Sequence, residues 1–169
     1  MKKGDVIMAS MTNVLFLCTG NSARSLIAEG ILRHEGGSRY RAFSAGSTPT
    51  GKPNPFALAV LQRHGIDTEF ARSKSWDEFA TADAAQMNII ITVCDNAAGE
   101  VCPIWPGQPI AAHWGVADPA GVTGTDEAIA AAFQITYDQM SCRIEKLLDL
   151  EISDPAEMQR AVAAIGDLP

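Results

Sequence analysis

Residues 13–25 read N-V-L-F-L-C-T-G-N-S-A-R-S, and this stretch decides the fold. Its first six residues form a continuous apolar run with β-branched and aromatic side chains, which is typical of a strand buried on both faces of a parallel sheet. A tight loop follows at residues 19–23. Apolar residues then recur at helical spacing over residues 25–34, until Gly36 and Gly37 end the pattern. The stretch therefore predicts a strand, a tight loop and a helix.

The rest of the chain repeats this alternation. We predict further strands at residues 40–45, 88–94 and 110–114, and helices at residues 56–64 and 126–150, with a short helix near residues 77–81. Strands that alternate with helices favour a parallel sheet covered on both faces, so the fold class is α/β.

A length of 169 residues fits one domain. We expect a flexible N-terminal extension at residues 1–12, the main domain at residues 13–150 and a helical C-terminal extension at residues 151–169. In that extension Asp154 is the expected helix N-cap, with Pro155 as the first helical residue. Two roles stay open for it: covering the edge of the sheet, or forming contacts in a dimer.

Composition excludes several classes of protein. The net charge of −7 repels nucleic acids, and 47% hydrophobic residues is an ordinary globular value, which argues against disorder. The chain shows neither a signal-peptide core nor a stretch approaching a membrane span. We therefore expect a cytoplasmic protein, monomeric or weakly dimeric, with no nucleic-acid or membrane partner. Any anion that it binds must be held by a local cluster of donors.

Such a cluster is predicted at the end of the first strand, where ligands bind in doubly wound sheets. A loop that leads directly into a helix can wrap its N–H groups around an oxyanion at the positive end of the helix dipole. Cys18 at its mouth should then be a thiolate, and Ser25 is expected to donate a hydrogen bond to it. Arg24 can grip two oxygens of the anion. The predicted oxyanion-binding residues are Thr19, Gly20, Asn21, Ser22, Ala23, Arg24 and Ser25.

The chain contains four cysteines: Cys18, Cys94, Cys102 and Cys142. Cys94 and Cys102 are separated by seven residues, which does not fit the usual zinc spacing of about two to four. We therefore predict no metal site, although ordinary core thiols remain an alternative for this pair. Cys142, midway along the last long helix, is interpreted as structural.

The Cys-x5-Arg-Ser loop resembles the nucleophilic loop of the low molecular weight protein tyrosine phosphatase superfamily, and the resemblance extends over residues 13–150. It implies a three-layer sandwich with a central four-stranded parallel sheet. It also implies that Cys18 is the nucleophile and that Ser44 supports the loop residue Asn21. Asp118, in an Asp-Pro pair late in the chain, matches the general acid of the phosphatases.

Two features depart from the phosphatases. Ala120 follows the Asp-Pro pair, where those enzymes usually have a tyrosine, so an aromatic wall for a phosphotyrosine ring is missing. The pair Cys94 and Cys102, together with the sequence H-W-G at residues 113–115, resembles the arsenate reductases built on the same fold. This resemblance implies reduction of arsenate to arsenite, with phosphate or sulfate as a mimic of the substrate.

The reductase resemblance implies a relay of three thiols. Cys18 forms a covalent adduct with arsenate, Cys94 attacks the Cys18 sulfur, and Cys102 then moves the disulfide to Cys94 and itself. A continuous helix from residue 94 to residue 102 would separate the two Cα atoms by about 12 Å, beyond the roughly 7 Å limit of a disulfide. We therefore predict that this segment unwinds when it is oxidised.

The remaining expectations concern partners. We expect no tightly bound cofactor and an external thiol reductant, either thioredoxin or another dithiol or thiol system. Some related reductases hold potassium near residues matching Asn21, Glu29 and Ser44; we favour an ordinary helix charge for Glu29, with potassium as the alternative. Two rival functions stay open, a phosphomonoesterase of the tyrosine phosphatase type and a non-enzymatic anion or redox sensor.

Overall fold

The structure is a computed structural model that describes residues 11–99 and 105–169. Four parallel strands form one sheet in the order β2-β1-β3-β4. This confirms the predicted α/β class and the central four-stranded parallel sheet. The strands are β1 (Thr12–Cys18), β2 (Tyr40–Gly46), β3 (Ile89–Thr92) and β4 (Ile110–His113).

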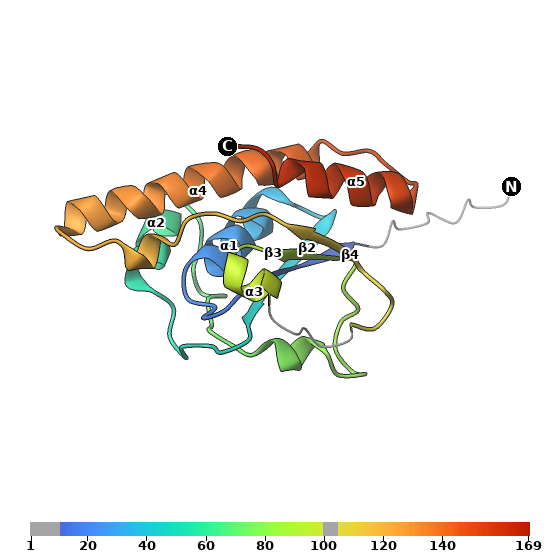
Figure 1. Cartoon of the computed structure of the whole chain (residues 1–169), viewed down its shortest axis with the longest axis horizontal. Helices are drawn as coiled ribbons and strands as arrows, with labels where there is room; N and C mark the ends of the chain where they lie inside the picture. The colour runs from blue at the N-terminus through green and yellow to red at the C-terminus, as the bar shows by residue number, and fades with distance from the viewer. Residues whose placement is uncertain (1–10, 100–104) are drawn as a thin grey trace, which may run out of the picture.

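The long helices lie together on one face of the sheet, with α4 and α5 outermost (Figure 1). Their side chains pack on alternate residues of the central strand, such as Val14 and Phe16, which have no exposed surface. These helices are α1 (Arg24–Glu35), α2 (Pro55–Arg63), α4 (Asp126–Leu148) and α5 (Pro155–Ile165).

The other face of the sheet has a thinner cover. Leu15 and Leu17 point to this side and pack against Trp76 and Met87 from the segment between α2 and β3. The regular structure in that segment is a short 3-10 helix, η1 (Trp76–Phe79). Loops therefore provide most of the third layer of the sandwich.

Local sequence signals place the helix ends. The side chains of Asn54, Thr125 and Asp154 accept hydrogen bonds from the first turns of α2, α4 and α5 respectively. The predicted N-cap Asp154 and first helical residue Pro155 are confirmed. β1 begins at Thr12, one residue before the predicted start, and residues 1–10 of the expected N-terminal extension lie outside the described residues.

Helix α5 covers the outer edge of β4. The amide of Gln159 both accepts from the Ala111 N–H, at 3.2 Å, and donates to the Ala111 carbonyl, at 2.6 Å. This pair of bonds occupies main-chain groups that an edge strand would otherwise leave open to another chain. The C-terminal extension thus covers the edge of the sheet, the first of the two roles considered for it. Among the described helices, none is long and apolar enough to cross a membrane.

The parallel arrangement brings the ends of the strands to one edge of the sheet. Cys18 at the end of β1 is level with Gly46 at the end of β2, while Thr92 in β3 pairs with His113 in β4. Cys94 follows β3 by two residues, and the short helix α3 (Asp95–Gly99) begins directly after it. This edge holds the candidate site.

Candidate active site

The loop between β1 and α1 is held from outside by its carbonyl groups. The carbonyls of Thr19, Gly20 and Ser22 accept main-chain hydrogen bonds from residues 48, 50 and 54, at 2.8–3.0 Å. Because the carbonyls turn outward, the N–H groups of these peptides turn toward the concave side of the loop. Asn21 makes the turn possible with a left-handed backbone φ of 46°. The loop therefore has the shape of the predicted oxyanion nest.

Gly46 is needed for this geometry. A Cβ atom at this position would lie 2.4 Å from the carbonyl oxygen of Thr19 and 3.0 Å from the backbone nitrogen of Asn21. The strand end of β2 therefore packs directly against the backbone of the loop, and a larger residue would displace it.

Arg24, the first residue of α1, reaches the loop that follows β4. Its Nη1 donates to the Val116 carbonyl at 3.2 Å, and its Nη2 lies 3.8 Å from Oδ1 of Asp118. Asp118 also accepts from the Ala120 N–H as the N-cap of η2 (Pro119–Gly121). The fold thus brings Arg24 and Asp118 together although 94 positions separate them in the sequence.

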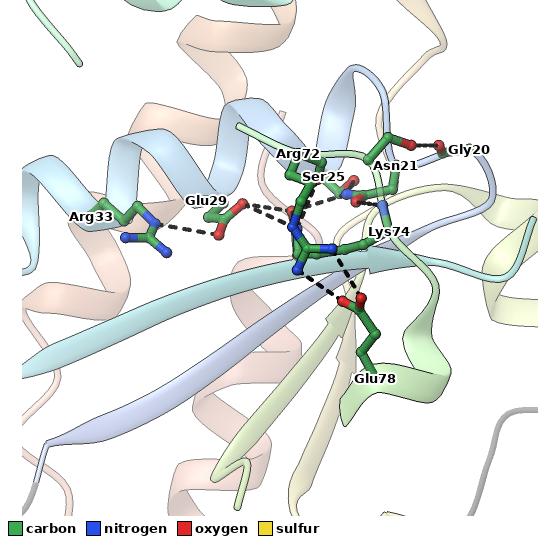
Figure 2. Close-up of polar contacts among 10 residues, drawn as sticks. Gly20, Asn21, Ser25, Glu29, Arg33, Arg72, Lys74 and Glu78 are labelled. Atoms are coloured by element: carbon green, nitrogen blue, oxygen red, sulfur yellow. Dashed lines mark hydrogen bonds and ion pairs between the residues drawn. The ribbon is translucent and has the colours of Figure 1, made fainter. Parts of the chain in front are cut away.

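Asn21 is the centre of a buried network (Figure 2). Its Nδ2 donates to the hydroxyls of Ser25 and Ser44, both at 2.9 Å, and its Oδ1 accepts from the Lys74 N–H at 3.0 Å. The expected contact between Ser44 and Asn21 is therefore present. Within the described residues, no hydrogen bond joins Ser25 to the Cys18 sulfur, so that expectation was wrong. The Asn21 amide is what Ser25 contacts instead.

The network continues to Glu29, and here the interpretation as an ordinary helix charge was wrong. Glu29 is 1% exposed; its Oε2 accepts from the Ser44 hydroxyl at 2.6 Å, and Lys74 Nζ lies 4.0 Å from the same oxygen (Figure 2). Burial raises the pKa of Glu29 and lowers the pKa of Lys74, while their mutual attraction opposes both shifts. The ammonium of Lys74 thus supplies a positive charge at the place where a potassium ion was considered.

Sequence analysis missed Lys74 because it lies in an irregular segment with no motif. That segment is tied to the site at several points. The Ser73 hydroxyl donates to the Gly20 carbonyl, Lys74 Nζ donates to the Arg72 carbonyl at 2.9 Å, and Glu78 accepts two hydrogen bonds from the Arg72 guanidinium (Figure 2). Residues 72–74 lie about 50 positions after the loop between β1 and α1, so their contact with it becomes visible only in the folded structure.

Cys18 and Cys94 lie in contact at the floor of the site, 5% and 2% exposed. The contact with Cys94, followed by burial, raises the pKa of Cys18, although Arg24 and the Gly20 N–H act to lower it. The same contact, together with the N–H of Ala97, lowers the pKa of Cys94 to about 5 despite its burial. The ionisations of the two thiols are therefore coupled, and a negative charge on one sulfur opposes ionisation of the other.

The expectation of a Cys18 thiolate stays a prediction, because the two thiols ionise as a coupled pair. The sequence shows a nest and a helix end beside Cys18, but it does not show a second thiol beside the first. A neighbouring thiolate makes a second negative charge at Cys18 costly. Transfer of the proton from Cys18 to Cys94 is what places the charge on Cys18.

Comparison with known proteins now identifies the family. Residues 13–163 match the low molecular weight phosphotyrosine protein phosphatase family. The chain belongs to this family. Arsenate reductases of Halalkalibacterium halodurans and Bacillus subtilis are 37% and 35% identical to it, over 78% and 80% of this chain and 91% and 94% of theirs.

Solved structures of the phosphatase family agree with this assignment. The low molecular weight protein tyrosine phosphatase of T. tengcongensis superposes with a TM-score of 0.67 at 26% identity, over 83% of this chain and 99% of that one. A thioredoxin-dependent arsenate reductase of Corynebacterium glutamicum superposes with a TM-score of 0.56 at 25% identity, over 86% of this chain and 66% of that one.

Two predicted relay or spectator residues remain. Cys102 lies outside the described residues, so the structure places only Cys18 and Cys94 of the proposed relay. Cys142 is exposed on α4 and is not a core thiol. In the described part of the chain, no group of three or more His, Cys, Asp or Glu side chains could hold a metal ion.

His113 at the end of β4 contacts the start of α3. Its Nδ1 lies 2.7 Å from the Thr92 hydroxyl, and its Nε2 lies 2.9 Å from Oδ1 of Asp95, the residue after Cys94. Both His113 and Asp95 have exposed surface, at 40% and 94% of their side chains. His113 thus links β4 to the first residue of α3, which directly follows Cys94.

Proposed function

We propose that this chain reduces arsenate to arsenite, with Cys18 as the nucleophile and Cys94 as the second thiol of the reaction. One observation carries the assignment of residues: two buried thiols are in contact beneath an oxyanion nest. Hydrolysis of a phosphate ester on this fold requires one thiol, whereas a two-electron reduction requires two. The similarity to curated arsenate reductases supports the reaction.

The first step uses the nest and Arg24. Arsenate is tetrahedral, so the N–H groups of residues 19–25 and the Arg24 guanidinium can hold its oxygens as they would hold those of phosphate. The Cys18 proton passes to Cys94, and the Cys18 sulfur bonds to arsenic. One arsenate oxygen leaves as water after protonation, for which Asp118, beside Arg24, is the proposed proton donor.

The second step transfers the electrons. Cys94, after losing its proton again, attacks the Cys18 sulfur, a sulfur–sulfur bond forms, and the sulfur–arsenic bond breaks with its electron pair remaining on arsenic. Arsenic(V) becomes arsenic(III), arsenite leaves, and a disulfide joins Cys18 to Cys94. Cys102 then attacks Cys94, which releases the Cys18 thiol and leaves a disulfide between Cys94 and Cys102.

An external thiol reductant must break this last disulfide. We propose thioredoxin or a similar dithiol, which fits a disulfide formed within one chain, and the dependence of a structural relative on thioredoxin supports this choice. Glutaredoxin with glutathione and mycothiol are the alternatives. A relay of free thiols also requires a reducing compartment, so we propose that the protein works in the cytoplasm, as a monomer or weak homodimer.

A phosphatase of the tyrosine type is the second candidate, because the family and the Arg24–Asp118 pair favour it. Against it stands Ala120, which follows Asp118 and Pro119 where the phosphatases usually carry tyrosine. A small side chain at this place provides no wall for an aryl phosphate, whereas a free oxyanion needs none.

Cys94→Ser tests the proposal. We expect this variant to lose arsenate turnover with thioredoxin, thioredoxin reductase and NADPH, while any hydrolysis of p-nitrophenyl phosphate persists. Cys142→Ser is the matched control and should retain both activities, since Cys142 is exposed and remote in the sequence from the site. If the parent protein does not complete multiple turnovers, a sensor is favoured. If Cys94→Ser keeps full arsenate reduction, a mechanism that uses Cys18 and an external small thiol is favoured. Replacing thioredoxin by glutaredoxin with glutathione, or by mycothiol, identifies the reductant.

A further inference from the structure

Arg143 on α4 is a buried charge that the reaction does not use. It is 4% exposed, yet among the described residues it forms no ion pair. Its Nε is buried without a partner in the same set of residues, and burial lowers the pKa of the guanidinium. Burial of such a group costs free energy, so an apolar side chain at this position would be the simpler way to fill the core.

The guanidinium instead joins two parts of the backbone. Nη1 donates to the Gly115 carbonyl at 3.2 Å, and Nη2 donates to the Leu168 carbonyl at 2.9 Å. Gly115 begins the loop after β4, and Leu168 lies beyond the end of α5. Arg143 therefore connects the C-terminal extension to the loop at residues 115–118.

This loop carries two groups that contact Arg24. Val116 provides the carbonyl that accepts from the Arg24 guanidinium, and Asp118 provides the nearby carboxylate. The Val116 N–H is held by the Val93 carbonyl at 3.3 Å, one residue before Cys94. The loop also borders an open cavity of about 350 Å³ lined in part by His113, Ala117 and Asp167. Among the described residues, the hydrogen bonds of Gly115 and Val116 hold the loop beside that cavity.

The end of α5 is fitted against the same backbone. Trp114 has no exposed surface, and its indole N–H donates to the Val162 carbonyl at 2.9 Å. A Cβ atom on Gly166 would lie 2.2 Å from the His113 carbonyl oxygen, so the helix end and the strand end touch. The backbone that leads into the loop thus cannot shift without moving α5.

We propose that Arg143 is a positioning residue of the oxyanion site. Through the Gly115 carbonyl it holds the loop that presents the Val116 carbonyl, and that carbonyl orients Arg24 toward the nest. The C-terminal extension acts through the same guanidinium, so it supports the site in addition to covering β4. The inference deepens the proposed function and rests on it, because it assigns Arg24 to oxyanion binding.

Binding of inorganic phosphate at equilibrium, measured by calorimetry, tests this without requiring turnover. We expect Arg143→Met to weaken phosphate binding about tenfold, which corresponds to about 1.4 kcal/mol, and Arg143→Lys to weaken it less. Arg39→Met is the matched control: the Arg39 guanidinium also donates to a main-chain carbonyl at 2.9 Å, but that of Leu148. It should bind phosphate as the parent does.

A double-mutant cycle separates positioning from general loss of stability. In an Arg24→Lys background, the Arg143→Lys substitution should have little further effect on phosphate affinity, because its action passes through Arg24. Equal effects in both backgrounds, or unchanged affinity in Arg143→Met and Arg143→Lys, would overturn the inference. A parent protein that binds neither phosphate nor arsenate would overturn the proposed function instead.

Discussion

At the scale of single residues, the pair of thiols determines the chemistry. Cys18 and Cys94 are 76 positions apart, yet their ionisations are coupled because β1 and β3 are neighbours and end at the same edge. The lowered pKa within this pair keeps a reactive thiol available near neutral pH without a histidine base. In the proposed reaction, the disulfide forms between the same two thiols whose ionisations are coupled.

The low pKa of the thiol pair depends on both cysteines. In the parent protein we expect a thiolate to form with a midpoint near pH 5, the value to which the pKa of Cys94 is lowered. In Cys94→Ser the midpoint should shift, because Cys18 loses the neighbour that raises its pKa and keeps Arg24, which lowers it. Thiolate absorbance in the ultraviolet, followed against pH, measures it, and Cys142→Ser should keep the midpoint. If Cys94→Ser also keeps it, Cys18 carries the low pKa, as the sequence alone suggests.

Gly46→Ala should impair the nest. The added Cβ would meet the Thr19 carbonyl oxygen at 2.4 Å, which forces the loop backbone to move. We expect phosphate affinity to fall by about tenfold or more, equivalent to about 1.4 kcal/mol or more, as measured by calorimetry. Gly99→Ala is the control, because a Cβ there meets nothing within 4 Å. Unchanged phosphate binding in Gly46→Ala would contradict the assigned role of this contact.

At the scale of elements, the irregular segment between α2 and β3 does more than connect them. The Ser73 hydroxyl donates to the Gly20 carbonyl and the Lys74 N–H donates to the Asn21 side chain. The Lys74 side chain enters the buried network at Glu29 and Ser44. The Lys74 ammonium, 4.0 Å from Oε2, and Arg33 of α1, whose Nε lies 3.3 Å from Oε1, together supply positive charge to this buried carboxylate.

Potassium should therefore have little effect on the parent protein. Lys74→Met removes the more buried of the two cations that pair with Glu29 and leaves Arg33, so we expect a loss of about 3 kcal/mol in the free energy of unfolding. Combining it with Glu29→Gln should recover part of that loss. Chemical denaturation with and without potassium chloride, and with sodium chloride as the ionic control, measures both effects. A parent stabilised specifically by potassium would show that Lys74 does not fill this place.

Oxidation should unwind α3. Its five residues begin directly after Cys94, and a disulfide from Cys94 to Cys102 cannot span a continuous helix. Amide hydrogen exchange of residues 95–99 should become faster in the oxidised protein, whereas exchange in α1 should stay the same. Equal protection of α3 in the reduced and oxidised states would refute the prediction.

At the scale of the whole molecule, the parallel strands bring the site residues to one edge of the sheet, and the helices on one face pack against the backbone of that edge. The helices α4 and α5 supply the contacts of Arg143 and cover the edge of β4, so the functional edge belongs to the same cooperative unit as the core. Ionisation of the thiol pair is therefore linked to folding.

Stability should depend on pH through Cys94. Its pKa in the folded chain is about 5 against an ordinary value of 9.0, so the stabilisation is fully present above pH 9 and is lost as the pH falls to about 5. The difference in unfolding free energy between the parent and Cys94→Ser should shrink over this range as the pH is lowered. Urea titrations at a series of pH values measure it. A difference that stays constant would show that Cys94 is not ionised in the folded protein.

Much of the fold and part of the site are predictable from local sequence. The apolar run before Cys18, the helix caps at Asp154 and Thr125 and the spacing of Cys18 and Arg24 all depend on residues close together in the chain. The interactions that determine these features act within one strand or one helical turn, so the local sequence is enough to predict them. The predicted strands and long helices are accordingly found within a few residues of their expected ends.

The sequence by itself determined the α/β fold and the nest between β1 and α1, together with a set of candidate thiols. Only the tertiary structure decided that Cys94 lies beside Cys18, that Lys74 lies within ion-pair distance of Glu29, and that Arg143 reaches the loop of Asp118. Each of these contacts joins residues far apart in the chain. Their distances depend on how strands align and how helices pack, and no local pattern encodes that alignment.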